Sequence, residues 1–160
     1  MVPAPRRRLR RGARTGRSGP ARRTAGFQHY LAGSTLNEIP QGAADAVAEL
    51  SQATDQYAQG PGPGEHHSYT CRMRAHTDLA LVRLRTSELD AAITALAPVM
   101  ALSPARRTAL LSRRLAVVRI ELAQPRYQGS AQASDLDEQI EEFGRDTIVG
   151  ALHDLPANPS

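Results

Sequence analysis

The sequence predicts an all-α protein in which about five helices form antiparallel hairpins, arranged as a short solenoid or bundle. Three observations lead to this prediction. Apolar residues recur at helical spacing, Ala and Leu are abundant while β-branched residues are scarce, and clusters of Gly, Pro and Ser interrupt the pattern. With 41% hydrophobic residues among 160, the chain can build one core. That core must be aliphatic, because Trp is absent.

The first two helices are expected near residues 42–58 and 67–85. The first has apolar residues at i, i+4, i+7 and i+14, namely Ala43, Val47, Leu50 and Tyr57. The second has them at i, i+4, i+8 and i+11, namely Cys71, Ala75, Leu79 and Val82. Between them, the GPGPGEHH segment at 60–67 stops any helix.

The third helix, expected at 88–102, has the most continuous apolar stripe. Its members are Leu89, Ala92, Ile93, Leu96, Val99 and Met100. Ser87 can cap this helix, with Asp90 three residues later in a capping-box position. The short loop before it predicts an antiparallel hairpin with the second helix.

Two further helices are expected after residue 104. The fourth, near 105–123, carries a stripe made of Leu111, Leu115, Val118 and Leu122. Ser103 and Pro104 suit its N-cap and first helical position. The fifth begins at 131 or 135, where acidic residues would favour a helix start, and runs to near 150. Its stripe is Leu136, Ile140 and Phe143, and Gly144 is a candidate early end.

Charge separates a lead segment from the rest of the chain. Nine Arg and no acidic residue lie in residues 1–26, and the remainder holds eleven Arg against all 16 acidic residues. The lead has too few apolar residues to offset its ordering entropy, so it is predicted to be disordered. The expected organisation is a disordered lead at 1–26, a helical domain at 27–150 and a flexible C-terminus at 151–160.

The composition also predicts a cellular location. The single cysteine, Cys71, excludes an intramolecular disulfide framework and fits a reducing cytosol. No apolar run approaches the roughly 20 residues that span a bilayer, and the Arg-rich start lacks a signal peptide's apolar stretch. A cytoplasmic protein without membrane contact is expected.

The hairpin at 76–104 resembles a tetratricopeptide repeat. The residues that define the repeat, small ones for close approach and bulky ones for the groove, are Leu79, Ala80, Leu89, Ala92, Leu96 and Pro104. The sequence departs from the repeat at His76, where a large aromatic is usual, and at Arg83, where Tyr is usual.

The wider stretch 27–146, most clearly 66–146, is similar to the C-terminal region of high-GC bacterial regulators of the Xre type. In that family a helix-turn-helix DNA-binding domain precedes a tetratricopeptide-like sensor region. No pair of amphipathic helices with a short turn is found in residues 1–40, so the helix-turn-helix domain is missing here. The resemblance implies a sensor or dimerisation region that binds a protein or peptide.

No catalytic residues, metal site or cofactor are predicted. His66, His67, Cys71 and His76 have metal-ligand chemistry, but His76 drifts around the helix and no CxxC or HExxH accompanies them. Cys71 is therefore expected in the core with the histidines solvated. The acidic run on the fifth helix is expected to be a solvated face, because no calcium loop surrounds it. The chain is accordingly not expected to be an enzyme.

Two groups of arginines are candidate binding residues. The first, on the fourth helix, either pairs with the acidic fifth helix or lines a groove for an acidic peptide, and comprises Arg106, Arg107, Arg113 and Arg114. The second could contact nucleic-acid phosphates and comprises Arg6, Arg7, Arg8, Arg10 and Arg11.

Three functions remain open on this basis. The leading hypothesis is a protein- or peptide-interaction module, with self-association among the partners considered. The second is a nucleic-acid-binding protein that acts through its Arg-rich arm. The third is a non-functional truncated regulator.

Overall fold

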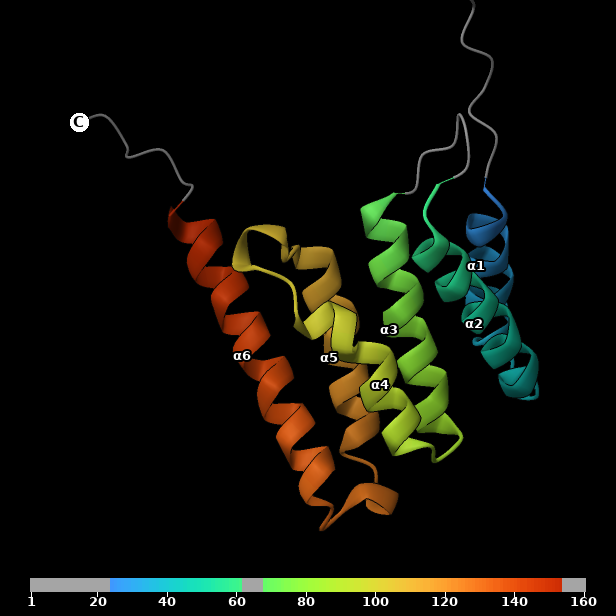
Figure 1. Cartoon of the computed structure of the whole chain (residues 1–160). Helices are drawn as coiled ribbons and strands as arrows, with labels where there is room; N and C mark the ends of the chain where they lie inside the picture. The colour runs from blue at the N-terminus through green and yellow to red at the C-terminus, as the bar shows by residue number, and fades with distance from the viewer. Residues whose placement is uncertain (1–23, 62–67, 154–160) are drawn as a thin grey trace, which may run out of the picture.

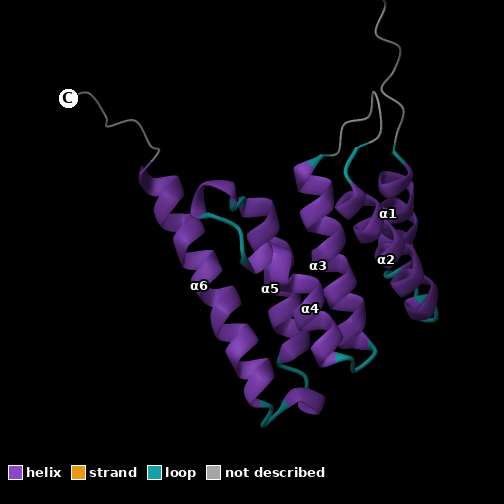
Figure 2. Ribbon diagram, in the orientation of Figure 1, coloured by secondary structure: helices purple, strands orange, loops and turns teal. Residues whose placement is uncertain are grey.

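The computed structural model describes residues 24–61 and 68–153, with side chains as far as residue 147, and over these residues it is all-helical (Figures 1 and 2). This confirms the predicted fold class. The six α-helices in chain order are α1 (Ala25–Leu36), α2 (Ala43–Gln59), α3 (Tyr69–Arg85), α4 (Leu89–Met100), α5 (Ala109–Leu122) and α6 (Ala131–His153). Short 3-10 turns, Pro104–Arg106 and Pro125–Tyr127, precede α5 and α6.

The helices form three successive hairpins, α1–α2, α3–α4 and α5–α6, which lie side by side along the molecule in Figure 1. Within this array α3 contacts both α1 and α5, so the first helices of the hairpins form a row that we call the inner row. Helix α3 also packs on α2, and α6 packs on α4. Such stacking of hairpins is the arrangement of a short solenoid or bundle, as predicted.

The core is aliphatic and is centred on α3. The largest fully buried side chains include Leu50, Leu84, Leu96 and Leu115, one from each of four helices. Because α1, α2, α4 and α5 all contact α3, every residue from Thr77 to Val82 is buried. This burial explains why the middle of α3 reads as a continuous apolar run rather than as a stripe.

Helix α1 was not among the predicted helices, and it begins inside the segment predicted to be a disordered lead. Thr24 caps it by accepting a hydrogen bond from the Phe27 amide at 3.3 Å, so the boundary predicted at residue 26 is wrong. The helix buries Gly26, Tyr30 and Gly33, and the two glycines lie directly against α2. Two of these three are glycines, which carry no hydrophobic periodicity. The rest of the predicted lead, residues 1–23, lies outside the described residues, as do residues 154–160.

Two of the predicted caps are wrong. Ser87 does not cap α4: it takes a left-handed conformation with φ of 64°, and Glu88 begins the helix without a side-chain cap bond. The turn is closed instead by the Ser87 and Glu88 amides, which donate to the Leu84 and Arg83 carbonyls at 2.9 and 2.8 Å. Such bonds satisfy the last carbonyls of α3.

The predicted N-cap of the fourth helix belongs to a separate turn. Ser103 and Pro104 begin the 3-10 turn Pro104–Arg106, and α5 starts only at Ala109. There Thr108 is the N-cap and accepts a hydrogen bond from the Leu111 amide at 3.3 Å. The helix is therefore shorter at its start than the predicted 105–123.

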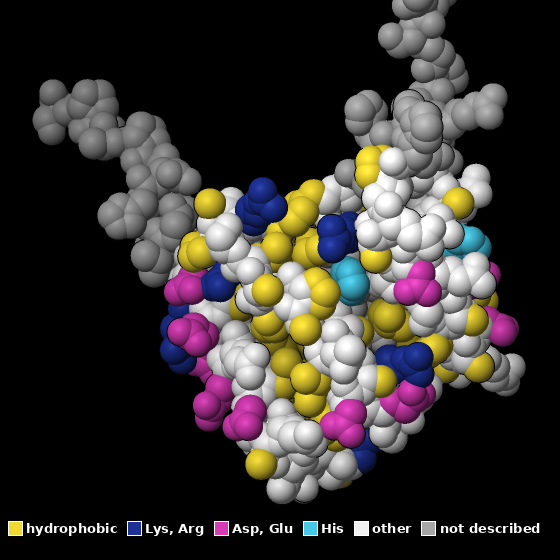
Figure 3. Space-filling model, in the orientation of Figure 1, with side chains coloured by type: hydrophobic (Ala, Val, Ile, Leu, Met, Phe, Trp, Pro, Cys, Tyr) yellow, Lys and Arg dark blue, Asp and Glu magenta, His cyan; other side chains and the backbone are white. Residues whose placement is uncertain are grey.

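The last helix is continuous through Gly144, which the sequence indicated as a candidate early end. Helix α6 runs through Gly144 to His153, and it starts at Ala131, where the Ala133 amide donates to the Ser130 hydroxyl. The acidic residues expected at its start therefore lie beyond its first turn. Figure 3 shows acidic side chains along the edge that α6 forms and hydrophobic side chains over the middle of the same view. Within the described residues, none of the helices has the length and apolar character needed to cross a membrane.

Because α1 packs closely on α2, replacement of two different glycines by Ala should have opposite effects on stability. A Cβ added at Gly33 would lie 2.6 Å from Leu50 Cγ and 3.1 Å from the Leu50 backbone nitrogen, so α1 would have to move. Gly33→Ala should lower the free energy of unfolding by about 1–3 kcal/mol in urea denaturation. Gly144→Ala, with open space around it, should raise it by about 0.5–1 kcal/mol. Equal effects at the two positions would contradict the packing described.

His76 predicts a pH dependence of stability. Its Nδ1 lies 3.1 Å from the Ala95 carbonyl oxygen on α4. Burial lowers its pKa from 6.5, and Arg72 lowers it further, against the opposing effect of the Ala95 hydrogen bond. The unfolded chain therefore binds more protons between the two pKa values, so stability falls as pH drops through 6.5.

Urea denaturation on both sides of that pH measures this slope, which the histidine limits to about 1.4 kcal/mol per pH unit. His76→Gln should reduce it. A variant with the slope of the unchanged protein would show that His76 is not its source.

Candidate binding site on the inner row

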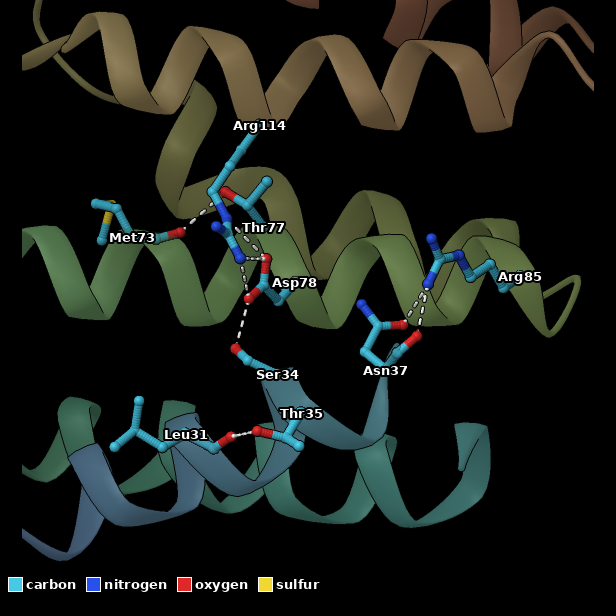
Figure 4. Close-up of polar contacts among 9 residues, drawn as sticks. All are labelled: Leu31, Ser34, Thr35, Asn37, Met73, Thr77, Asp78, Arg85 and Arg114. Atoms are coloured by element: carbon cyan, nitrogen blue, oxygen red, sulfur yellow. Dashed lines mark hydrogen bonds and ion pairs between the residues drawn. The ribbon is translucent and has the colours of Figure 1, made fainter. Parts of the chain in front are cut away.

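A buried carboxylate, Asp78, lies where the three inner-row helices meet (Figure 4). Asp78 comes from α3 and is 3% exposed. From α5, Arg114 donates through Nε to Oδ1 at 2.9 Å and through Nη2 to both oxygens at 2.6 and 2.5 Å. From α1, the Ser34 hydroxyl donates to Oδ2 at 2.7 Å. One side chain thus joins α1, α3 and α5.

The hydrogen-bonding capacity of the Asp78 carboxylate is filled at this junction. Each carboxylate oxygen of Asp78 already accepts two hydrogen bonds, which use the lone-pair directions that it has. Burial opposes the charge on Arg114, but the hydrogen bonds to Asp78 outweigh it and raise the pKa of the guanidinium. Arg114 is therefore held in its charged, hydrogen-bonded form.

A second polar contact joins the same helices nearer their C-terminal ends. Arg85 Nη1 donates to the backbone oxygen and to Oδ1 of Asn37, both at 2.8 Å (Figure 4). Arg85 Nε also lies 3.9 Å from a carboxylate oxygen of Glu121 on α5. Asn37 is the C-cap of α1, so this contact fixes where α1 ends against α3.

A cavity of about 310 Å³ lies between these two polar contacts. Leu81 and Val117 provide its apolar wall. Its polar lining is Asn37, Glu38, Thr77, Asp78, Arg85 and Arg114. The cavity therefore combines a small apolar surface with several fixed polar groups.

Arg74, one turn before Asp78 on α3, carries a charge that the described residues do not neutralise. Its guanidinium carbon lies 5.4 Å from the centre of the Tyr30 ring, and its Nε is buried without a hydrogen-bond partner. Burial raises the pKa of Tyr30, Asp78 adds to the rise, and Arg114 and Arg74 oppose it. With two arginines and one carboxylate around Tyr30, this end of the inner row is positive.

The four arginines predicted as one cluster are separated in the structure. Arg114 binds Asp78, as described, and Arg106 lies over the Tyr69 ring at 5.7 Å. Arg107 donates to Leu102 O at 3.0 Å and to Asp146 of α6 at 2.5 Å. Arg113 is exposed and makes no hydrogen bond or ion pair with the described residues. Of the four, only Arg107 pairs with the acidic last helix.

The acidic face of α6 is paired by an arginine that the sequence did not single out. Arg119 Nε donates to Asp137 Oδ1 at 2.7 Å, and its Nη2 donates to Glu141 at 3.2 Å. The hydrogen bond from Arg119 lowers the pKa of Asp137. Asp135 and Glu138 remain exposed, so the predicted solvated face describes only part of the acidic run.

The remaining candidate residues have mixed positions. Of the repeat-defining residues, Leu79, Ala80, Ala92 and Leu96 are buried, Leu89 is partly buried, and Pro104 is exposed. Cys71 is only partly buried, against the core position predicted for it. His76, predicted to be solvated, is mostly buried. His66 and His67 lie outside the described residues, as do Arg6, Arg7, Arg8, Arg10 and Arg11. The described residues contain no group of three or more metal-binding side chains.

Comparisons of the chain with protein-family models, with curated proteins and with solved structures gave no match. The function is therefore argued from the residues and from their geometry.

The Asp78 junction predicts a large difference between two arginines. Arg114→Met would leave a buried carboxylate without its ionic partner, and the free energy of unfolding should fall by about 3–5 kcal/mol. Arg72→Met, at an exposed position of α3, should change it by less than about 0.5 kcal/mol. Combining Arg114→Met with Asp78→Asn should recover part of the loss, because the stranded charge is gone. Strictly additive losses in urea denaturation would contradict the pairing.

Proposed function

We propose that this chain is a protein-interaction module whose inner row binds an acidic segment of a partner protein. The observation that carries the proposal is Arg74. A half-buried guanidinium with no hydrogen bond or ion pair to the described residues lacks the partners that such a group normally has. A carboxylate from a bound segment would supply them, as a charge-assisted hydrogen bond.

The surroundings of Arg74 suit a bound polypeptide. Leu110 lines a small hollow together with Arg74, and Val117 lines the larger cavity beside Asp78. Both of these α5 side chains are exposed, as is Leu31 on α1. An apolar rim around fixed polar groups can hold the side chains on either side of an acidic residue.

The Asp78 junction supports the proposal because it orders the surface before a partner arrives. Arg114 and Ser34 hold α1 and α5 against α3, so binding would not have to order these helices. A preformed site loses less entropy on binding. The carboxylate of Asp78 is fully hydrogen-bonded, which favours a recognition role over acid–base catalysis.

The resemblance to tetratricopeptide repeats is part of the same proposal. The first helices of the stacked hairpins lie in a row, and helical-repeat proteins build a binding surface from such a row. A role as the sensor region of a transcriptional regulator, acting in the cytoplasm, follows from that resemblance and from the single cysteine. The alternative, binding of nucleic acid by the Arg-rich arm, depends on residues outside those described.

An array of short peptides that vary in Glu content, each with a Glu→Gln counterpart, tests the proposal. The tightest binders should contain Glu and should lose affinity on replacement by Gln. In fluorescence polarisation, Arg74→Met should weaken the best peptide by at least about tenfold, the loss expected for a hydrogen bond between charged groups.

Arg72→Met, the same substitution at an exposed position of α3, is the control and should change affinity by no more than about twofold. Equal effects of the two variants, or binding indifferent to Glu, would contradict the proposal.

A further inference from the structure

A cavity larger than the one on the inner row lies away from that site, at the C-terminal end of the array. It has a volume of about 670 Å³ and lies between α5 and α6. Tyr127 and Leu122, both buried, contribute to its lining. Its lining also includes the small residues Ala116, Ala123 and Ala133 and the charged Glu138. The small residues leave room for side-chain atoms from outside.

Helix α5 bears a second stripe, opposite its buried one, along this cavity. Its members follow i, i+4, i+7, i+11 and i+14 and are all exposed: Ala109, Arg113, Ala116, Ile120 and Ala123. Ile120 is 65% exposed, the highest value among the exposed large hydrophobic residues described. Residues at this spacing face a neighbouring helix in packed helix pairs.

In the first two hairpins, helices of the same chain cover the corresponding surface. Helix α3 packs on both α1 and α2, and α5 packs on α3. Among the described residues no further helix packs on the third hairpin, so its stripe faces solvent. An uncovered end of stacked helices is normally capped by polar residues or covered by another element.

The charges beside the stripe point to a second copy of this chain as the cover. Arg113 and Glu138 are both exposed and make no ion pair with the described residues. Arg119 binds both Asp137 and Glu141, which sets the register of α6 on α5 and places Glu138 level with Ile120. Arg113 thus lies before Ala116 along α5, and Glu138, on α6, lies beyond the level of Ala116.

We propose that two copies of the chain associate through α5 about a two-fold axis beside Ala116. The two α5 helices then run antiparallel, and Ala116 permits their close approach. Residues equally far from Ala116 on either side face each other about this axis, so Arg113 of each copy lies over the hollow between α5 and α6 of the other and meets Glu138 there. Ile120 of each copy packs opposite Ser112 of the other, beside Ala109 and Arg113 of its stripe. One surface thereby serves both copies, as a two-fold interface requires.

The Arg-rich residues 1–23 are the other segment of this chain that could cover the surface. They hold nine Arg and only two sizeable aliphatic residues, Val2 and Leu9. Such a segment offers charge to α6 but few apolar side chains to pack on Ile120. The second copy matches both the apolar and the charged parts of the surface.

Sedimentation equilibrium of the full chain over a range of concentrations tests this dimer. The full chain should show a reversible monomer–dimer equilibrium, and Ile120→Asp should abolish it without changing the helical circular dichroism. The control is Ile39→Asp, which changes an exposed isoleucine in the loop after α1 and should leave the equilibrium unchanged. A chain that is monomeric at every concentration would overturn the proposal.

Charge reversal tests the register of the two copies. Arg113→Glu and Glu138→Arg should each weaken the dimer by about fivefold or more, because each places like charges together. The two substitutions combined in one chain should restore it. Failure of the combination to restore, or a dimer that persists in Ile120→Asp and is lost when residues 1–23 are removed, would overturn the proposed interface.

Discussion

The structure depends on the burial of one negative charge. An ionised carboxylate taken out of water costs several kcal/mol unless ionic and hydrogen-bonding partners surround it. Asp78 obtains these partners from Ser34, 44 residues earlier in the chain, and from Arg114, 36 residues later. The carboxylate can therefore be buried only when α1, α3 and α5 have assembled. This requirement selects one arrangement of the inner row from the several that apolar stripes alone would allow.

Small residues also stabilise this arrangement, because they let the helices lie close together. Gly33 lets α1 lie directly on Leu50 of α2, and Ala75 and Ala80 let other helices approach α3 on several sides. Close approach in turn brings short polar side chains such as Ser34 within reach of Asp78. The inner row then carries fixed polar groups and an apolar rim, while the outer side of α5 carries Ile120. The two surfaces suit different partners because one is positive and the other self-complementary.

The helices from α2 onward could be predicted because each has enough Leu, Val or Ile at helical spacing. Helix α1 could not, since its packing residues include Gly26 and Gly33, which produce no apolar stripe. The Asp78 junction was also missed, although an acidic residue directly before the apolar run from Leu79 to Val82 was a usable signal. Its partners are 36 and 44 residues away, and spacing along a helix carries no information about them. Proximity in sequence grouped Arg114 with Arg107, whereas the structure places Arg114 on Asp78 and Arg107 on Asp146.

Amide hydrogen exchange on the Asp78→Asn variant tests most directly whether this charge holds the inner row together. The substitution is in α3, and its side chain remains able to fill the same space. If Asp78 joins the three helices, exchange should accelerate in α1 and in α5 together, at amides far from position 78 in the sequence. Faster exchange confined to α3, or none at all, would contradict the account.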